Sequence, residues 1–247
     1  MAAQPPHQTT VNVTTTEAPA ETIIAGFSAY GLAGLTAADY LVTQLGLEET
    51  GYVTINALPT ITPFADGSPR HHTRLYSRSD LDVTVLVNEL LVPRWAADPF
   101  ASAVIEWLHE YRVDEISLLF GIPVVHQPGE HDVFFVATDD YRTHRLVETD
   151  LAPMGRGFLE GINASLIEHG MDTSLRVGLL STPVHEEVPD VEAAIRLVEA
   201  VDTLYELNVD TSELEAFAVK IEEYYQELSE RVKADETTQS PADGMFM

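Results

Sequence analysis

Cysteine is absent from this chain of 247 residues. Its absence excludes disulfide bonds, thiolate nucleophiles and zinc sites with thiolate ligands. The chain is long enough to fold without such cross-links, because a domain of this size buries roughly 70 to 75% of the surface that its unfolded form exposes. We therefore expect a fold stabilised by an ordinary hydrophobic core.

Basic residues are scarce. Thirteen Lys and Arg face 40 Asp and Glu, the formal net charge is −27 at pH 7, and Lys220 and Lys233 are the only lysines. A surface of this charge repels nucleic acids and anionic membranes, so neither is expected as a partner. Its self-repulsion also opposes folding, and molar salt screens it because the Debye length falls to about 3 Å. The composition thus predicts a protein of a high-salt cytoplasm.

An export signal and a membrane span are also missing from the pattern. Before Glu21 the sequence has neither a basic start nor an apolar signal core, and residues 1–20 are predicted to form a flexible leader. The uncharged stretch Thr22–Ala38 contains three glycines, and it is too short and too weakly apolar to cross a bilayer.

What the sequence does contain is an alternation of strand-like apolar runs and amphipathic helical segments. Strands are expected at Thr22–Phe27, Gly51–Leu58, as a hairpin or strand pair within Leu75–Asn88, and at Ile116–Phe120, Val133–Ala137 and Leu175–Leu180. Helices are expected after the first strand, from Asp98-Pro99 onward, and from about Gly157 to His169. Alternation of this kind predicts an α/β fold, a three-layer sandwich with a mostly parallel or mixed sheet, over residues 21–186.

The last third of the chain changes character. Apolar residues recur at helical spacing from Val191 to Tyr205 and again from Leu214 to Val232. Residues 187–233 are therefore predicted to form a helical hairpin that packs on the sandwich or on a neighbouring subunit. Residues 234–247 are predicted to be a disordered acidic tail, because apolar side chains larger than alanine return only at its end.

Two glycine clusters stand where a strand meets a helix. The first comprises Gly26, Phe27, Gly31 and Gly34, and the second Gly155, Gly157 and Gly161. The first lacks the G-x-G-x-x-G spacing of a dinucleotide site and the Gly-Lys-Ser/Thr of a phosphate loop, so close packing of a helix on a strand is the favoured interpretation. The second is interpreted as tight packing or a subunit contact, with Arg156 as a possible anion partner.

No catalytic group, metal site or cofactor is expected. The histidines show no ligand pair at i, i+4 with an acidic partner, and the serines lack a nucleophile elbow. Carboxylates are so numerous that a solvated face explains nearly all of them.

The chain ends in Met245-Phe246-Met247, three large apolar residues after an acidic stretch with no core of its own. Such side chains gain burial only against another surface, and a terminal carboxylate is a ready target for backbone donors or a lysine. The tail is therefore a candidate partner-binding motif, and chance placement of three apolar residues is the alternative.

The order and spacing of these features resemble the archaeal proteasome assembly chaperone family. The likeness spans Ile23 to Val232 and includes the two glycine clusters, the strand ending at Gly121 and the acidic helical segment opened by Asp190. It implies a non-catalytic, nucleoside-phosphorylase-like α/β sandwich that forms homo-oligomers, trimers to pentamers, and inserts its C-terminal tails between α-subunits of the 20S proteasome.

In that family the tail motif is a hydrophobic residue, a tyrosine and any residue, and Met245, Phe246 and Met247 match its three places. Phe246 departs from the tyrosine, which removes a hydroxyl hydrogen bond of about 1 kcal/mol. Two alternatives stay open: a nucleoside-phosphorylase-like enzyme that uses the Gly26–Gly34 turn and Arg156, and a structural oligomer with an inert tail.

Overall fold

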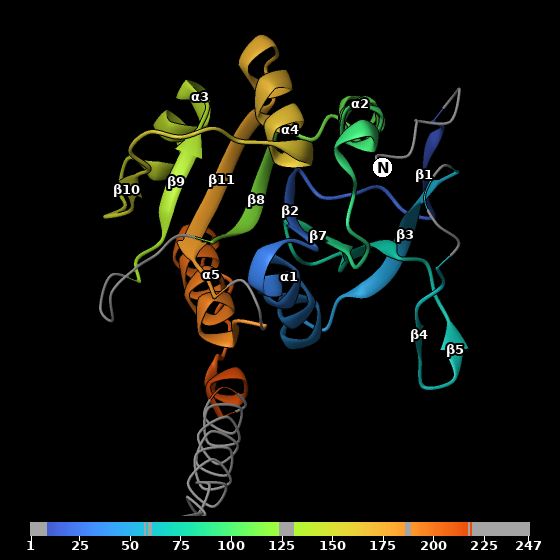
Figure 1. Ribbon diagram of the computed structural model, residues 1–247, viewed down its shortest axis with the longest axis horizontal. Helices are drawn as coiled ribbons and strands as arrows, with labels where there is room; N and C mark the ends of the chain where they lie inside the picture. Colours follow the sequence, from blue (N-terminus) through green and yellow to red (C-terminus); the bar gives the residue numbers. More distant parts are fainter. Residues whose placement is uncertain are drawn as a thin grey trace, which may run out of the picture.

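A mixed sheet of nine strands forms the centre of the protein (Figure 1). The computed structural model describes residues 9–56, 58, 61–123, 131–185, 189–216 and 218. The strand order is β1-β3-β6-β7-β2-β8-β11-β9-β10. The four neighbours β7, β2, β8 and β11 run parallel, whereas β1, β3 and β6 pair antiparallel on one side and β9 pairs antiparallel with β11 on the other.

The strands of this sheet are β1 Val11–Thr15, β2 Thr22–Phe27, β3 Glu48–Ile55, β6 Thr73–Ser77, β7 Val83–Asn88, β8 Glu115–Ile122, β9 Phe134–Ala137, β10 Ala152–Pro153 and β11 Arg176–Pro183. A separate two-stranded ribbon pairs β4 Phe64–Ala65 with β5 Ser68–Pro69. The helices are η1 Tyr30–Leu32, α1 Ala33–Gln44, α2 Arg94–Glu110, α3 Asp139–Tyr141, the π-helical turn η2 Arg142–Leu146, α4 Gly161–Asp172 and α5 Val191–Tyr205.

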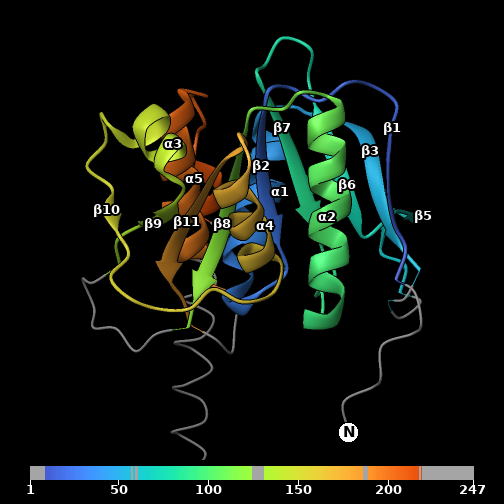
Figure 2. The same cartoon turned by 90° about the horizontal axis from the view of Figure 1, so that it is seen from above.

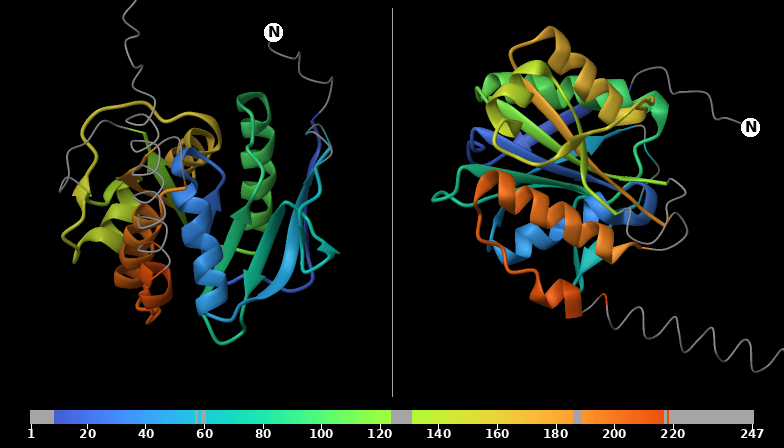
Figure 3. Two further views of the ribbon diagram at one scale, coloured as in Figure 1. Left: turned by 60° about the horizontal axis from the view of Figure 1, so that its bottom comes forward. Right: turned by 90° about the vertical axis from the view of Figure 1, so that its left-hand side faces the viewer.

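Helices cover both faces of the sheet, so the fold is the predicted three-layer α/β sandwich. α1 and α5 pack together on one face and α2 and α4 on the other (Figures 2 and 3). Each face of the sheet has its own hydrophobic core, and alternate residues of β2 belong to different cores. Ile24 packs in the α1/α5 core, and Ile23 and Ala25 pack in the α2/α4 core. Strand β7 is buried along its whole length, as the apolar run Val83, Val85, Leu86 and Val87 predicts.

The N-terminal leader needs a correction, because Val11–Thr15 form strand β1 on the edge of the sheet. Its partner is β3, and the register pairs Val11 with Ile55 and Thr15 with Gly51. Asn12 and Thr14 of β1 are exposed, while Val11 and Val13 pack partly on the α2/α4 core. Apolar and polar residues alternate along this strand, so its composition alone does not distinguish it from a solvated segment.

The start of α2 also differs from the prediction. The helix begins at Arg94, so Asp98 is not its cap and Pro99 lies inside it. The added turn buries Ala96 and Ala97, and the N–H of Ala96 donates to the Pro93 carbonyl at 2.8 Å. Burial of this turn outweighs the hydrogen bond that a proline in the first half of a helix removes.

Helix α5 confirms the first stripe of the predicted C-terminal hairpin. It lies beside α1 and packs on β11, and therefore completes a layer of the sandwich. Residues 212–216 and 218 are helical again. The remainder of the second stripe and the tail, including Met245, Phe246 and Met247, lie outside the described residues.

Candidate functional site

The first glycine cluster lets α1 approach the sheet closely. A Cβ built on Gly26 would lie 2.2 Å from the carbonyl oxygen of Gly34, and one on Gly34 would lie 2.1 Å from the carbonyl oxygen of Leu119. Both distances are far below any contact that a real Cβ makes. The backbones of α1, β2 and β8 therefore touch at positions where a side chain larger than hydrogen does not fit.

Gly31 has a second role in the same turn. Its φ of +61° lies in the left-handed region, and a Cβ there would lie 2.9 Å from the Cβ of Val184. Its carbonyl accepts a hydrogen bond of 2.8 Å from the N–H of Asp190, the residue before α5. The turn after β2 is thus fixed to the start of α5.

Asp190 caps α5 as well. Its carboxylate accepts 2.9 Å hydrogen bonds from the N–H groups of Ala193 and His185, and it lies 2.8 Å from Nδ1 of His185. Burial alone would raise the pKa of Asp190, but the hydrogen bonds from His185 and Ala193 outweigh burial and hold that pKa below its usual value.

Tight packing, one of the two interpretations of the second glycine cluster, is not found at Gly155 and Gly157. A Cβ at Gly155 or Gly157 would meet no heavy atom of the described chain within 4 Å, so tight packing inside the subunit does not explain these two glycines. Gly161 opens α4 with a φ of +65°, which favours glycine for conformational reasons. Arg156 is exposed.

The turn after β2 and the start of α4 meet at one cavity, although they are far apart in the sequence. The cavity has a volume of about 630 Å³ and lies at the carboxyl ends of β2 and β8. Its walls come from Phe27 to Leu32, Leu91 to Arg94, Phe120, Glu160 to Asn163 and Pro189. The carboxyl edge of a parallel sheet is where open α/β folds bind their ligands.

Two large apolar side chains stand exposed in the segments that border this cavity. Leu91 is 66% exposed and Phe158 is fully exposed. An ion pair between Arg94 and Glu160 joins the two segments. Exposed apolar groups gathered beside a cavity are typical of a surface that contacts another molecule.

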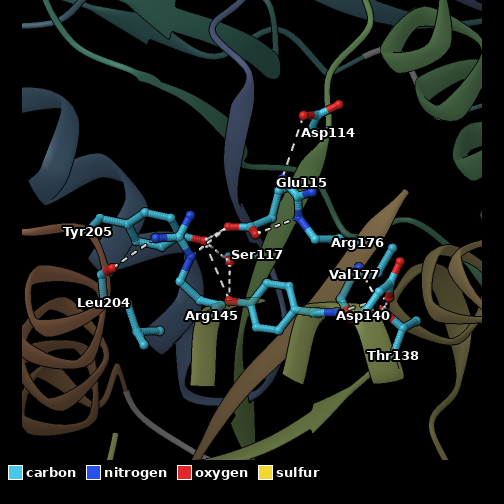
Figure 4. A network of polar contacts seen from close by, with 11 residues as sticks. Asp114, Glu115, Ser117, Thr138, Asp140, Arg145, Arg176, Val177, Leu204 and Tyr205 are labelled. Carbon is cyan, nitrogen blue, oxygen red and sulfur yellow. Dashed lines mark hydrogen bonds and ion pairs between the residues drawn. The ribbon is translucent and has the colours of Figure 1, made fainter. Parts of the chain in front are cut away.

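A buried polar network lies near the opposite end of the parallel strands (Figure 4). The Glu115 side chain is 0% exposed. Its Oε1 accepts hydrogen bonds from Arg145 Nε at 2.9 Å and Tyr205 Oη at 2.8 Å, and its Oε2 accepts one from Arg176 Nε at 3.1 Å. Two arginines and a phenol thus compensate a carboxylate removed from water.

Two tyrosines extend the network from Glu115 to Ser117 on the same strand, β8. The hydroxyl of Ser117 lies 2.6 Å from Tyr141 Oη and 2.5 Å from Tyr205 Oη. Burial, with the nearby Tyr141 and the Glu115 charge, raises the pKa of Tyr205 well above its usual value, and burial raises that of Tyr141. Both hydroxyls therefore keep their protons and act as hydrogen-bonding groups.

The sequence reading missed this network because it treated the carboxylates as a solvated face. A single signal was available: Glu115 is the first residue of a mainly apolar strand that is buried along most of its length. Its partners, Arg145, Arg176 and Tyr205, are scattered over the following 90 residues, and the fold alone brings them together.

The chain beyond α5 stays attached to the sandwich as far as the described residues extend. Tyr40 Oη on α1 donates to the carbonyl of Asp210 at 2.6 Å, and Leu214 is buried against the α1/α5 core. The described residues after α5 therefore lie against the α1 side of the sandwich. Across the described ranges, no helix has both the length and the apolar character that a membrane span requires.

The fold and these sites define a class of protein: an α/β sandwich with a cavity at the carboxyl edge of its parallel strands. Comparison with known proteins identifies the family. The PAC2 family model matches residues 23–229, so the chain belongs to the PAC2 family. The resemblance predicted from the sequence is thereby confirmed.

Similar structures show the same fold. PbaA of Pyrococcus furiosus, described as an archaeal homolog of proteasome-assembly chaperone, superposes with a TM-score of 0.84 at 20% identity over 93% of this chain and 95% of its own. PbaB of Pyrococcus furiosus, described as an archaeal proteasome activator, gives a TM-score of 0.76 at 18% identity over 89% and 99% of the two chains. An uncharacterized protein of Methanocaldococcus jannaschii is 22% identical over 213 residues, 85% of each chain.

Proposed function

We propose that this protein is a non-catalytic proteasome assembly chaperone or activator that works in a high-salt cytoplasm. The observation that carries the proposal is its membership of the PAC2 family together with its structural likeness to PbaA and PbaB, which are described as a chaperone homolog and a proteasome activator.

The partner in this proposal is the ring of 20S proteasome α-subunits, and the contact is made by Met245, Phe246 and Met247. The attachment of residues up to 214 to α1 supports it, because the C-terminal segment then starts from a fixed point on the subunit. Burial of one Phe and part of two Met side chains contributes about 4 to 6 kcal/mol before ordering costs, so a single tail binds weakly.

Several tails on one particle overcome this weakness, which is why the proposal includes a homo-oligomer of three to five subunits. The exposed Leu91 and Phe158 beside the cavity support a contact between subunits. Linked tails raise the overall affinity by about 10² to 10⁴ without any new contact.

The test is a pull-down of purified α-rings with the full chain and with a variant that lacks Met245 to Met247. We expect the truncated variant to lose binding while it stays folded. The matched control removes residues 1–8 from the other terminus and should bind like the full chain. Undiminished binding by the C-terminal truncation would refute the tail mechanism.

A single substitution sharpens the test. Phe246→Tyr restores the hydroxyl of the family motif and should strengthen binding by about fivefold, the equivalent of one hydrogen bond of about 1 kcal/mol. Phe246→Ala should weaken it. If both variants bind like the parent, the aromatic position does not carry the contact.

A further inference from the structure

The ribbon of β4 and β5 and the residues before it, 61–69, form an arm that projects from the body of the subunit (Figure 1). Among the described residues, its two strands pair with each other and with no strand of the central sheet. Asp66 and Gly67 join them with φ values of 50° and 76°, as in a type I′ hairpin turn. The N–H of Arg70 donates to the carbonyl of Pro63 at 2.9 Å and closes the base. The arm is therefore preformed.

Two large apolar side chains of the arm are left in solvent. Phe64 is 76% exposed and Ile61 is 53% exposed, and neither is part of the two hydrophobic cores. A two-stranded ribbon by itself is at best marginally stable in water, and contact with a further surface stabilises it. We therefore expect the arm to pack against a second molecule.

The cavity at the carboxyl edge of the sheet provides an apolar surface of the kind that the arm needs. Its volume is about 630 Å³, and its walls are mainly apolar. It opens to solvent, because Tyr30 and Leu91 in its wall are 41% and 66% exposed. Phe158, in the segment that borders it, is fully exposed. The arm and this surface hold five of the eight large apolar side chains that the described residues expose, so both are candidates for a contact with another molecule.

The charges of the two surfaces favour a second copy of this chain as the partner. With a net charge of −27, two copies repel each other wherever their acidic surfaces meet. Asp66 is the only charged residue of the arm. Arg94 and Glu160, the only charged residues among the described lining of the cavity, form an ion pair. The Arg94 side chain is 79% exposed, so the cavity also offers a positive charge to the single acid of the arm.

We propose that the arm of one copy docks into the carboxyl-edge cavity of a second copy, with Phe64 and Ile61 as the apolar contacts. The contact joins two different surfaces, so each copy offers one arm and one cavity, and repetition of the contact closes a ring. A preformed arm loses little conformational freedom on binding, which favours association. The inference rests on the homo-oligomer of the proposed function, and it does not depend on the proteasome partner.

The test measures the mass of the full chain and of two variants by sedimentation velocity in 2 M KCl. Phe64→Asp places a charge on the arm and Leu91→Asp places one at the cavity, and both positions are exposed, so the melting temperatures should stay unchanged. We expect the parent to form a ring of several subunits and each variant alone to be a monomer. A monomeric parent, or a variant that keeps the parent mass, overturns the proposal.

The matched control is Val147→Asp. Val147 is 70% exposed and lies in neither surface, so this variant adds the same charge at a similar exposure. It should keep the mass of the parent. Dissociation of Val147→Asp into monomers would show that added charge alone disrupts the oligomer, and it would overturn the assignment of the two surfaces.

An equimolar mixture of the two variants distinguishes this contact from a symmetric one. Phe64→Asp retains an intact cavity and Leu91→Asp retains an intact arm, so we expect the mixture to form a dimer with one copy of each. A mixture that remains monomeric overturns the proposal. A contact between two arms would leave Leu91→Asp alone oligomeric, and a contact between two cavities would leave Phe64→Asp alone oligomeric; either result also overturns it.

The tail truncation separates failure of this inference from failure of the proposed function. The variant that lacks Met245 to Met247 should keep the mass of the parent, because the tail belongs to neither surface. Phe64→Asp keeps its tail and should bind α-rings at least tenfold more weakly than the parent, because monomers lose the avidity of linked tails. A truncated variant that becomes monomeric would place the subunit contact in the tail and overturn the inference.

Discussion

At the scale of single residues, Glu115 shows where the few basic residues of this chain are used. Arg145 and Arg176, which hydrogen-bond its buried carboxylate, have side chains only 22% and 24% exposed. Arg74 is fully buried and pairs with Glu89. These three arginines pair with buried or half-buried carboxylates and contribute little positive charge to the surface. The surface is therefore more acidic than the composition alone implies.

Tyr205→Phe tests the network at its contact with α5. The substitution removes the hydroxyl that donates to Glu115 at 2.8 Å. A hydrogen bond to a charged group contributes about 1.5 to 3 kcal/mol, and we expect that loss in the free energy of unfolding measured by urea titration.

The control for this prediction is Tyr111→Phe. The Tyr111 hydroxyl contacts Thr15 at 3.2 Å at the surface, and the side chain is 37% exposed. Its loss should change stability by less than about 0.5 kcal/mol. Equal effects of the two substitutions would show that the Glu115 network adds nothing to stability.

The periodicity of apolar residues places Tyr205 on the buried stripe of α5. It does not predict that the Tyr205 hydroxyl donates a hydrogen bond to Glu115. The pairing depends on the end of α5 reaching the start of β8, which is a property of the finished fold. The cavity is a similar case, because its walls are assembled from segments between Phe27 and Pro189.

At the scale of elements, α1 is a helix whose most deeply buried residues are mostly small. Its buried residues are Ala33, Gly34, Ala37, Ala38 and Leu41. The larger Leu35 and Val42 of the same helix are only partly buried. Because α1 approaches β2 and β8 closely, only small residues fit on the contacting face. A search for large apolar side chains at helical spacing does not identify that face.

Gly34→Ala is expected to be strongly destabilising. The added Cβ would lie 2.1 Å from the Leu119 carbonyl oxygen, a backbone atom that cannot move without shifting β8. Overpacking of this kind costs about 3 kcal/mol, which thermal and urea unfolding would detect.

Gly157→Ala is the matched substitution at a position where a Cβ meets nothing of the described chain within 4 Å. It should leave stability unchanged or raise it by up to about 1 kcal/mol through the unfolded state. A large loss of stability in this variant, and none in Gly34→Ala, would contradict the packing described for α1.

Most elements follow from the sequence, and their ends follow less well. β2 begins and ends where its apolar run predicts, and so do the strands of the β6–β7 pair to within two residues. The prediction that α2 starts at Asp98-Pro99 is wrong. Burial of Ala96 and Ala97 extends the helix toward the N-terminus, beyond the Asp-Pro pair that is typical of a helix start. β1 was missed because an edge strand with one polar face carries little apolar signal.

At the scale of the whole molecule, the net charge of −27 determines how stability depends on salt. Repulsion between the surface carboxylates opposes the compact state, and molar salt screens it. We expect the melting temperature in 2 M KCl to exceed that in 0.1 M KCl by about 10 °C, or about 3 kcal/mol for a chain of this size.

Calorimetry at a series of KCl concentrations checks this prediction. The shift should be largest below about 1 M, where the screening length changes most. Equal melting temperatures at both concentrations would remove the argument for a salt-adapted protein.

The two rims of the sheet differ in a way that limits aggregation. β10 is only two residues long and ends in Pro153, which has no N–H to offer, so another strand cannot extend the ladder there. β1 carries no proline, and one row of its backbone groups has no partner strand among the residues that the structure describes. If two copies joined through their β1 strands, the outer edge of the combined sheet would be β10 on both sides. Because Pro153 blocks pairing at β10, edge-to-edge association would end at a dimer and would not continue into a fibre.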